Sequence, residues 1–324
     1  MTVAELGEFG LIAVIQAALP PDHSSVVGIG DDAAVLRTPD GRVAATTDLL
    51  IEGRHFRRDW SAATDIGVKA AAQNLADIAA MGAVPTALLF GLAVPGTLAA
   101  DWVLGVTRGL AAECDRAGAA VVGGDVTSSD IIMLAITALG DLAGARPVTR
   151  AGARPGDLIA LTGPVGRSAA GLALLQSGFA AGPGQADPVA AELIAAHRQP
   201  QPDYPAGPAA AAAGATAMID ISDGLVADLG HIAAASAVQV ELDSARLPGT
   251  GVLATAAGWL GTDWRQWALT GGEDHALAAT FPEKTGAPAG WTLIGRASRG
   301  SGVVVDGEPW RGPGGWDHFA VPGR

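Results

Sequence analysis

The chain has 324 residues, 49% of them apolar, so it can bury a core the size of one large domain or two smaller ones. Its formal net charge of −13 argues against a nucleic-acid surface, because such surfaces need a basic stripe. Cys114 is the only cysteine, which excludes an intramolecular disulfide and a cysteine-based zinc site. No apolar run reaches the roughly 20 residues of a membrane span, and no signal-peptide pattern is present, so we expect a cytoplasmic protein without a membrane partner.

The usual lysine-based phosphate sites are absent from the sequence. Lys69 and Lys284 are the only lysines, and neither follows the glycine-rich frame of a P-loop. The motifs of protein kinases are missing as well. Any nucleoside triphosphate must therefore be bound by other means.

The first half of the chain predicts helices alternating with strands, which indicates a layered α/β domain. Helices are expected where apolar residues recur at near-helical spacing, over residues 5–19, 63–81 and 98–117. Short β-branched runs predict strands over residues 33–36, 43–47, 86–94, 119–122 and 131–139. The segment 49–56, of mixed polarity, is expected to form a loop.

Aspartates follow several of the predicted strands. They occur in Gly30-Asp31-Asp32, Thr46-Thr47-Asp48, Gly123-Gly124-Asp125 and Asp220-Ile221-Ser222-Asp223. Carboxylates that converge on one sheet edge repel one another by several kcal/mol at roughly 4 Å, unless cations lie between them. Oxygen ligands of this kind suit Mg²⁺. The pattern therefore predicts a site for magnesium ions.

Two polar residues interrupt an alanine-rich stripe of the helix over 63–81. Asn74 and Asp77 share this stripe with Ala70 and Met81. Taken alone, the pair is typical of a solvated helix face. Beside the other aspartates, Asp77 is also a candidate ligand.

The composition changes between residues 142 and 157, where Ala, Gly, Arg and Pro dominate. We place a domain boundary there, with a first domain of residues 1–146 and a second of residues 147–324. Arginines at 146, 150 and 154 form either a solvated linker or a phosphate clamp.

The second half predicts a mixture of strands and helices. Strands are expected over 157–161, 216–221 and 275–281, and the proline-rich stretch 198–208 is expected to be an extended connection. Ser222 can cap a helix whose N-terminus is an anion site.

Seven motifs, in their order and spacing, resemble the thiamine-monophosphate kinase family over essentially the whole chain. That family lies within the aminoimidazole-ribonucleotide synthetase-like group of ATP-binding proteins, with the hydrogenase-maturation factor HypE and selenophosphate synthetase. The motifs are Gly28-Ile-Gly-Asp-Asp-Ala33, Thr46-Thr-Asp48 with Gly53-Arg-His-Phe56, Asn74-Leu-Ala-Asp-Ile-Ala-Ala-Met-Gly82, Gly123-Gly-Asp125, Arg150-Ala-Gly-Ala-Arg-Pro-Gly-Asp157, Asp220-Ile-Ser-Asp-Gly224 and Gly271-Gly-Glu-Asp274.

The resemblance implies a PurM-like N-terminal α/β domain that forms a homodimer through its sheet, a C-terminal α+β domain, and ATP held where the two meet. It also implies roles for individual residues. The implied ligands of several Mg²⁺ ions are Asp32, Thr46, Thr47, Asp48, Asp77, Asp125, Asp220 and Asp223. The implied nucleotide contacts are Gly124, Asp125, Arg150 and Ser222, and the implied contacts to thiamine monophosphate are His55, Glu273 and Trp316. Whether Asp31 also binds metal, and how Trp316 and Phe319 divide their roles, stays open.

The implied activity is transfer of the γ-phosphoryl group of ATP to thiamine monophosphate, giving thiamine diphosphate. The acceptor phosphate loses its second proton near pH 6, so no residue is needed as a general base. Alternatives are a HypE-like or selenophosphate synthetase-like enzyme and a non-catalytic nucleotide- or metal-binding homologue. The position of Cys114 within a predicted helix, as an ordinary buried thiol, counts against the first two, which use a terminal cysteine or selenocysteine.

Overall fold

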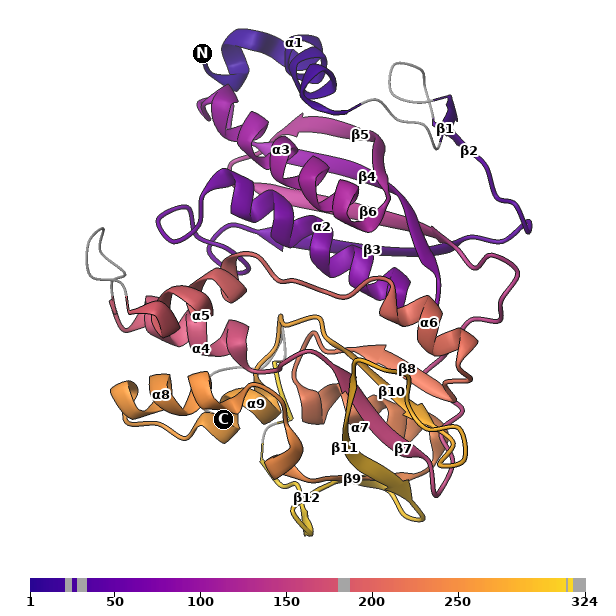
Figure 1. Ribbon diagram of the computed structural model, residues 1–324. Coiled ribbons are helices and arrows are strands. Elements are labelled where there is room, and N and C mark those ends of the chain that lie inside the picture. Colours follow the sequence, from indigo (N-terminus) through magenta and orange to yellow (C-terminus); the bar gives the residue numbers. More distant parts are fainter. Residues whose placement is uncertain (21–24, 28–33, 180–186, 313, 317–324) are drawn as a thin grey trace. The chain divides into compact units, whose positions relative to one another are not determined.

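The computed structural model describes residues 1–20, 25–27, 34–179, 187–312 and 314–316 (Figure 1). Asp31, Asp32 and Phe319 lie outside the described residues. The chain forms two compact units, one of Met1–Ala79 with Ala83–Gly144 and the other of Ala80–Gly82 with Ala145–Arg324. The change of unit after Gly144 falls in the Ala-, Gly- and Arg-rich stretch. No helix in the described part of the chain is long and apolar enough to cross a membrane.

The first unit is built on a four-stranded sheet in the order β3-β6-β4-β5. Its strands are β3 (Ala44–Ile51), β4 (Val84–Val94), β5 (Ala120–Ser128) and β6 (Met133–Asp141). The pairs β3–β6 and β4–β6 are antiparallel, and β4–β5 is parallel. The strands β1 (Ser25–Val27) and β2 (Val35–Leu36) form a separate antiparallel pair.

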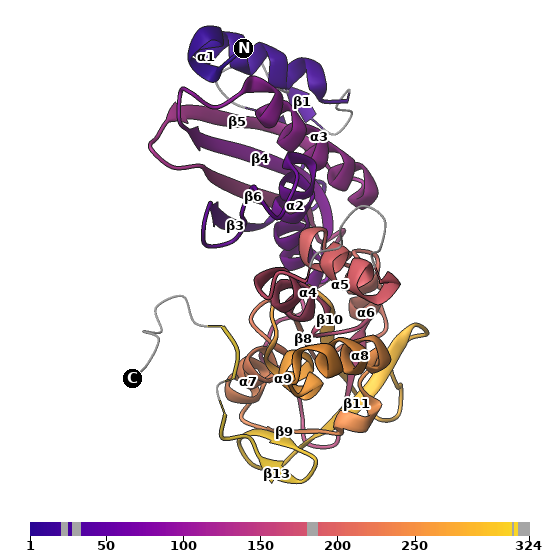
Figure 2. The same cartoon turned by 90° about the vertical axis from the view of Figure 1, so that its left-hand side faces the viewer.

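Two helices, α2 (Ala63–Ala80) and α3 (Ala100–Ala117), cover one face of this sheet (Figure 2). Fully buried side chains such as Leu50 and Ile136 point from the sheet toward this helical layer. The helix α1 (Val3–Ala18) packs along α3 and begins with a capping box, in which the Thr2 hydroxyl accepts the Glu5 N–H and the Glu5 carboxylate accepts the Thr2 N–H.

The second unit is built on a seven-stranded sheet in the order β13-β12-β9-β11-β7-β10-β8. All neighbouring strands are antiparallel except β9 and β12, which run parallel. Its strands are β7 (Leu158–Thr162), β8 (Ala217–Asp220), β9 (Gln239–Leu242), β10 (Leu277–Phe281), β11 (Trp291–Ser298), β12 (Gly302–Val305) and β13 (Glu308–Pro309).

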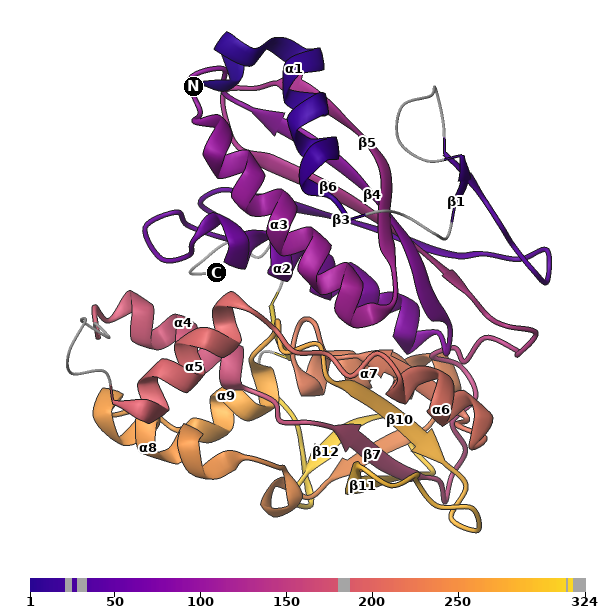
Figure 3. The ribbon, with the colours of Figure 1, turned by 45° about the horizontal axis from the view of Figure 1, so that its top comes forward.

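Four helices of the second unit pack against one another beside the sheet, while α7 packs on strands β8, β9 and β12 (Figure 3). The group of four consists of α4 (Arg167–Gln176), α5 (Pro188–Arg198), α8 (Thr250–Leu260) and α9 (Trp264–Thr270). The remaining elements are α6 (Ala206–Ala212), α7 (Leu225–Ser236) and the 3₁₀ turn Ser244–Arg246. An antiparallel sheet with helices grouped apart from it is an α+β arrangement. The two units together confirm the predicted α/β plus α+β fold class.

Several predicted boundaries are wrong, and strand pairing explains two of the errors. The predicted loop over 49–56 begins three residues too early, because Leu49–Ile51 pair with β6 and continue β3. Gly123–Asp125 are not a turn after a strand but the middle of β5, held by β4. Ala206 begins a helix within the proline-rich stretch that was expected to be extended. Cys114 is buried as expected, and burial raises the pKa of its thiol.

The helices α2 and α3 touch through two glycines. A Cβ at Gly67 would lie 2.1 Å from the Val106 carbonyl oxygen, and a Cβ at Gly109 would lie 2.1 Å from the Thr64 carbonyl oxygen. Both distances are far below van der Waals contact. Glycine is therefore required where these two helices cross, whatever the protein binds.

We predict that Gly109→Ala lowers the free energy of unfolding by about 1–3 kcal/mol, because the added methyl group forces the packed helices apart. Differential scanning calorimetry should show a lower melting temperature. Gly258→Ala is the matched control, since Gly258 lies in α8 with open space around it and its replacement should stabilise by up to about 1 kcal/mol. Equal effects of the two substitutions would contradict the close helix contact.

Candidate functional site

In the first unit, Asp77 is hydrogen-bonded across the sheet–helix interface. The Thr46 hydroxyl on β3 donates to the Asp77 carboxylate on α2 at 2.8 Å. Asn74, one turn earlier on α2, is fully buried, and its side-chain amide donates to the Ala70 carbonyl oxygen. The interpretation of this stripe as a solvated face is therefore wrong. Ala70 and Asn74 are buried, Asp77 meets the predicted metal ligand Thr46 on the sheet, and only Met81 at the end of the stripe is exposed.

Strand alternation divides the Thr46-Thr47-Asp48 motif between two faces of the sheet. Thr46 and Asp48 point toward the face that α2 covers. Thr47 points to the opposite face, where its hydroxyl donates to the Ile136 carbonyl oxygen and accepts from Thr137. The side chains of Thr46 and Asp48 can thus act together with Asp77, whereas Thr47 can join them only through its backbone.

Asp125 lies on the same face of the sheet as Thr47, opposite to Thr46 and Asp48. Register pairs Asp125 with Gly91, Gly91 with Ala135, and Ala135 with Leu49, so all four positions share the face that carries Thr47. One oxygen of the Asp125 carboxylate accepts the Val126 N–H at 2.9 Å. Within the first unit, Asp125 and Asp48 therefore do not converge on one point of the sheet.

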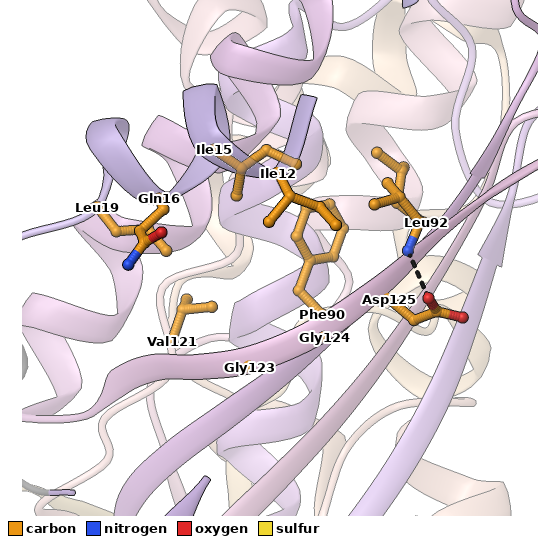
Figure 4. Close-up of a pocket in the computed structure, with 11 residues that line it drawn as sticks. Ile12, Ile15, Gln16, Leu19, Phe90, Leu92, Val121, Gly123, Gly124 and Asp125 are labelled. Atoms are coloured by element: carbon orange, nitrogen blue, oxygen red, sulfur yellow. Dashed lines mark hydrogen bonds between the residues drawn. The ribbon is translucent and has the colours of Figure 1, made fainter. Parts of the chain in front are cut away.

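A pocket lies between α1 and the edge strand β5, next to Gly124 and Asp125 (Figure 4). Its wall is mainly apolar. A Cβ at Gly124 would lie 2.0 Å from the Phe90 carbonyl oxygen, so the parallel pairing of β4 and β5 already requires glycine there. Glycine at this position is consistent with a nucleotide contact but does not depend on one. The pocket is lined by Ile12, Ile15, Gln16, Leu19, Phe90, Leu92, Val121 and residues 123–126.

His55 is fixed by the turn that follows β3. Its Nδ1 accepts the Ile51 N–H at 3.0 Å, and the turn is closed by the Gly53 N–H donating to the Phe56 carbonyl oxygen at 2.8 Å. Because Nδ1 is an acceptor, the neutral imidazole carries its hydrogen on Nε2.

In the second unit, the candidate residues gather on the segment Asp220–Gly224 at the end of β8. Three consecutive backbone N–H groups, those of Ser222, Asp223 and Gly224, donate to one oxygen of Asp228 at 3.0, 3.1 and 3.0 Å. Helix α7 begins only at Leu225, with Gly224 as its N-cap. The prediction of a Ser222-capped helix is therefore wrong, and Asp228 occupies the N–H groups that an anion would need.

The charged form of Asp228 is energetically unfavourable. Burial and the nearby carboxylates of Asp220 and Asp223 raise its pKa to about 7, while hydrogen bonds from the Gly224 and Asp223 N–H groups oppose the rise. The three backbone N–H groups that donate to Asp228 stabilise this charged form. Asp228 is thus a structural carboxylate within an acidic motif.

Asp220, at the end of β8, is buried against a histidine. The His275 Nδ1 lies 3.2 Å from Asp220 Oδ2, and both side chains are only 6% exposed. A carboxylate held in this way has one fixed orientation. Like Asp228, His275 is a residue that the motif analysis did not single out.

The Gly271–Ala276 loop is tied by its backbone to the Asp220–Gly224 segment. The Glu273 N–H donates to the Ser222 carbonyl oxygen at 2.8 Å, and the His275 N–H donates to the Ile221 carbonyl oxygen at 2.9 Å. Glu273 and His275 both have left-handed backbones, with φ of +65° and +54°. Conformations of this kind persist only where the surroundings enforce them, and they are common at binding sites.

Trp316 is tied to the same segment. Its N–H donates to the Asp223 carbonyl oxygen at 2.9 Å, and a Cβ at Gly315 would lie 2.2 Å from that oxygen. The Trp316 residue is 62% exposed, so it does not plug the core of the second unit. The structure therefore brings Glu273, Trp316, Ser222 and Asp223 together.

Arg150 is exposed, and its loop is anchored on α7. The Ser236 hydroxyl donates to the Arg150 carbonyl oxygen at 3.0 Å and accepts the N–H groups of Gly152 and Ala153. The anchored backbone leaves the guanidinium group free to reach an anion.

Among the described residues, no group of three or more His, Cys, Asp or Glu side chains is close enough to hold a metal ion. Instead, Thr46 contacts Asp77 in the first unit, and Asp220 and Asp223 both lie near Asp228 in the second. All of them offer oxygen, which fits the preference of Mg²⁺ for one or two carboxylates per ion.

Asp228 and His275 are contributors that the sequence reasoning missed, and Asp274 stands in the motif Gly271-Gly-Glu-Asp274 without a predicted role. Two signals could have found them. An Asp four residues after Asp223-Gly224 can reach back to the turn, and the glycine pair before Glu273 marks a loop in close contact with another backbone.

Two family models match the chain over both units. The N-terminal domain model of AIR synthase related proteins matches residues 30–142, and the C-terminal domain model matches residues 154–283. The chain therefore belongs to the AIR synthase related family. Within it, the relatives below place the chain in the thiamine-monophosphate kinase family.

Curated relatives match over nearly the full length. A thiamine-monophosphate kinase of Mycobacterium tuberculosis is 46% identical over 323 residues, which is 99% of this chain and 94% of the relative. The thiamine-monophosphate kinase of Escherichia coli K12 is 37% identical over 337 residues, with 98% and 99% covered.

Similar solved structures support the same family assignment. The thiamine-monophosphate kinase of Stenotrophomonas maltophilia K279a is 35% identical with a TM-score of 0.82, covering 96% of this chain and 99% of that one. A structure described as AaThiL complexed with AMPPCP and TMP is 36% identical with a TM-score of 0.80, covering 98% and 99%. The hydrogenase maturation protein HypE shares the fold at 19% identity.

Asp274 yields a prediction about pH. The residue keeps some exposure, but desolvation of its carboxylate raises the pKa to about 6, against the stabilising N–H groups of Ser168 and Gly166. The native state therefore binds this proton more tightly than the unfolded chain, whose pKa is 3.8. The contribution of Asp274 to stability is fully present below about pH 4 and is lost as pH rises through about 6.

We predict that the unfolding free energy of the wild type minus that of Asp274→Asn falls by about 2 to 3 kcal/mol between about pH 4 and pH 7. Denaturant unfolding at several pH values measures this difference, in which the other titrating groups cancel. A difference that does not change with pH would show that the Asp274 pKa is not raised.

Proposed function

We propose that this protein transfers the γ-phosphoryl group of ATP to the phosphate of thiamine monophosphate, producing thiamine diphosphate and ADP. The observation that carries the proposal is the full-length similarity to thiamine-monophosphate kinases, at up to 46% identity among the relatives named above. The related structure with AMPPCP and TMP supports it, because AMPPCP is an ATP analogue with a non-hydrolysable β–γ link.

The chemistry of the acceptor explains why the site is rich in aspartates and has no obvious base. A phosphate monoester loses its second proton near pH 6, so the attacking oxygen arrives ionised. The barrier is then the repulsion between two polyanions, and catalysis consists mainly of positioning and charge stabilisation. We infer direct in-line transfer without a phosphoenzyme.

Thr46, Asp48 and Asp77 are the residues of the first unit that we propose as Mg²⁺ ligands, because their side-chain oxygen atoms lie on the side of the sheet that α2 covers. Asp220 and Asp223 are the candidates of the second unit, and Asp32, Thr47 and Asp125 complete the proposed set. Bound Mg²⁺ would neutralise phosphate charge and orient the transferred group. The Thr46 hydroxyl holds the Asp77 carboxylate in place.

Glu273 and Trp316 are the proposed contacts to the acceptor. An exposed indole ring can cover the cationic thiazolium or stack on the aminopyrimidine, worth about 0.5–2 kcal/mol. Glu273 supplies a negative charge for the same cation. His55, in the first unit, is the third proposed contact. Gly124, Arg150 and Ser222 are proposed contacts of the nucleotide, Ser222 through its hydroxyl because its N–H donates to Asp228.

The test is a coupled assay of ADP release with thiamine monophosphate, thiamine and aminoimidazole ribonucleotide precursors side by side. We expect turnover only with thiamine monophosphate, because the alcohol of thiamine needs a general base to attack. EDTA should abolish it. Efficient turnover of thiamine, or activity that survives EDTA, would contradict the mechanism, and no turnover of thiamine monophosphate would contradict the function.

Asp77→Asn is the matched variant for this assay. It keeps the size of the side chain but removes the charge, so kcat should fall by roughly 100-fold or more, the scale of several kcal/mol of lost charge stabilisation. The melting temperature without ligands should change little. A kcat within a few-fold of the wild type would remove Asp77 from the proposed ligands.

We also propose that the protein is a homodimer through the sheet of the first unit. On the face away from α2 and α3, the side chains of Ala45, Thr47 and Leu49 are exposed, and Leu49 is 50% exposed. A sheet face of small and apolar side chains is unusual on a monomer surface and is typical of an interface.

Leu49→Arg should convert the dimer to a monomer, because it places a charge in the proposed apolar contact. Light scattering after size-exclusion chromatography measures the mass. Leu293→Arg is the control, since Leu293 is a 38%-exposed leucine on β11 of the second unit and its replacement should leave the dimer intact. A monomeric wild type, or a dimeric Leu49→Arg variant, would contradict the proposed interface.

A further inference from the structure

Two polar side chains lie within the helix pair α4–α5 of the second unit, and no step of the proposed reaction uses them. Ser168 is fully buried and His197 is 6% exposed. The Ser168 Oγ lies 3.0 Å from the His197 Nδ1. Apolar neighbours such as Leu193 and Ile194 surround them on α5. Burying a hydroxyl and an imidazole is unfavourable unless their hydrogen bonds are made, so an apolar pair would fill this space at lower cost.

The position of His197 is fixed by close helix packing. A Cβ at Gly171 on α4 would lie 2.1 Å from the Leu193 carbonyl oxygen and 3.0 Å from the His197 Cβ. The backbones of α4 and α5 therefore touch one turn after Ser168. The His197 Cβ therefore cannot move away from α4 without separating the helices.

The other neighbour of His197 is Glu273, which we proposed above as a contact of the acceptor. The His197 Nδ1 lies 3.5 Å from Glu273 Oε2, and the Glu273 side chain is 34% exposed. Its backbone is already fixed by the hydrogen bond to Ser222 and by its left-handed conformation. His197 thus approaches the one part of Glu273 that the backbone does not fix, the carboxylate.

The hydrogen-bonding chemistry of Glu273, His197 and Ser168 determines which group donates the hydrogen. An ionised carboxylate only accepts hydrogen bonds, so its proximity favours the imidazole form that carries a hydrogen on Nδ1. The Ser168 Oγ can share this hydrogen as a second acceptor. A long glutamate side chain loses rotamer freedom when it binds a ligand, and a side chain that is held beforehand loses less.

We propose that His197, supported by Ser168, is a positioning residue that holds the Glu273 carboxylate ready for the cationic acceptor. The inference rests on the proposed function, because it takes Glu273 to be a contact of thiamine monophosphate. His197 itself does not touch the substrate. Its removal should weaken binding of the acceptor and leave ATP binding unchanged.

The experiment is a double-mutant cycle with His197→Leu, Glu273→Ala and the double variant. For each protein, KM for both substrates, kcat and the dissociation constant of thiamine monophosphate by calorimetry are measured. We expect His197→Leu to raise KM and the dissociation constant for thiamine monophosphate roughly three- to tenfold, the scale of ordering one side chain. KM for ATP should stay within about twofold, and in the Glu273→Ala background His197→Leu should have no further effect.

A pair of amide variants separates positioning from packing. His197→Asn places its amide near the position of Nδ1, whereas His197→Gln places it near Nε2. Both keep a buried polar side chain, and they also serve if His197→Leu does not fold. We expect Asn to restore the KM for thiamine monophosphate and Gln to leave it raised.

The outcomes distinguish the inference from the proposed function. If Glu273→Ala raises KM for thiamine monophosphate while His197→Leu and His197→Gln do not, or if the effects simply add in the double variant, the positioning role is wrong and the function stands. An unchanged KM in Glu273→Ala refutes Glu273 as a substrate contact, and the positioning role with it. A wild type that does not phosphorylate thiamine monophosphate overturns both the function and the inference.

Discussion

The Asp228 carboxylate is the constraint on which the site of the second unit depends. One of its oxygens accepts three consecutive N–H groups, of Ser222, Asp223 and Gly224, and so fixes the turn between β8 and α7. Such a concave set of N–H groups would otherwise bind an external anion. Because the internal carboxylate already fills it, the turn has one shape before any substrate arrives. The carbonyl oxygens of the same turn then face outward, where Glu273 and Trp316 hydrogen-bond to them.

The Gly271–Ala276 loop takes its shape from this turn. Left-handed conformations at two non-glycine residues, Glu273 and His275, cost about 1–3 kcal/mol each in an isolated chain. Here each is offset by a backbone hydrogen bond to the turn, and Asp274 between them accepts two N–H groups at the start of α4. Successive side chains of the loop therefore point to three places, toward α5, toward α4 and toward Asp220. The Gly271–Ala276 loop therefore connects the α4–α5 helix pair, the sheet of the second unit and the proposed contact to the acceptor.

Sequence reasoning was successful where the local pattern decides the structure. Apolar periodicity located α2, α3, β4 and β6 to within about two or three residues, which is the usual precision for such boundaries. It failed where distant pairing decides. Asp125 looks like the end of a strand, but β4 extends β5 past it, and strand alternation then turns Asp125 and Thr47 away from Asp48. Ser222 looks like a helix cap, but the cap position falls to Gly224 because Asp228 reaches back over the turn. Neither outcome can be read from the motif itself.

The aspartates of these motifs are of two kinds, and their donors separate them. Asp228 and Asp274 accept backbone N–H groups, which are fixed and cannot be exchanged for a metal ion or a phosphate without unfolding the turn. Asp77 accepts from the Thr46 hydroxyl, which can rotate and is itself an oxygen ligand. A carboxylate of the second kind can change partners during a reaction, and one of the first kind cannot. Asp125 lies between the two kinds, because one of its oxygens accepts a single backbone N–H, that of Val126. The acidic residues that resemble one another in the sequence therefore divide into those that build the site and those available to act in it.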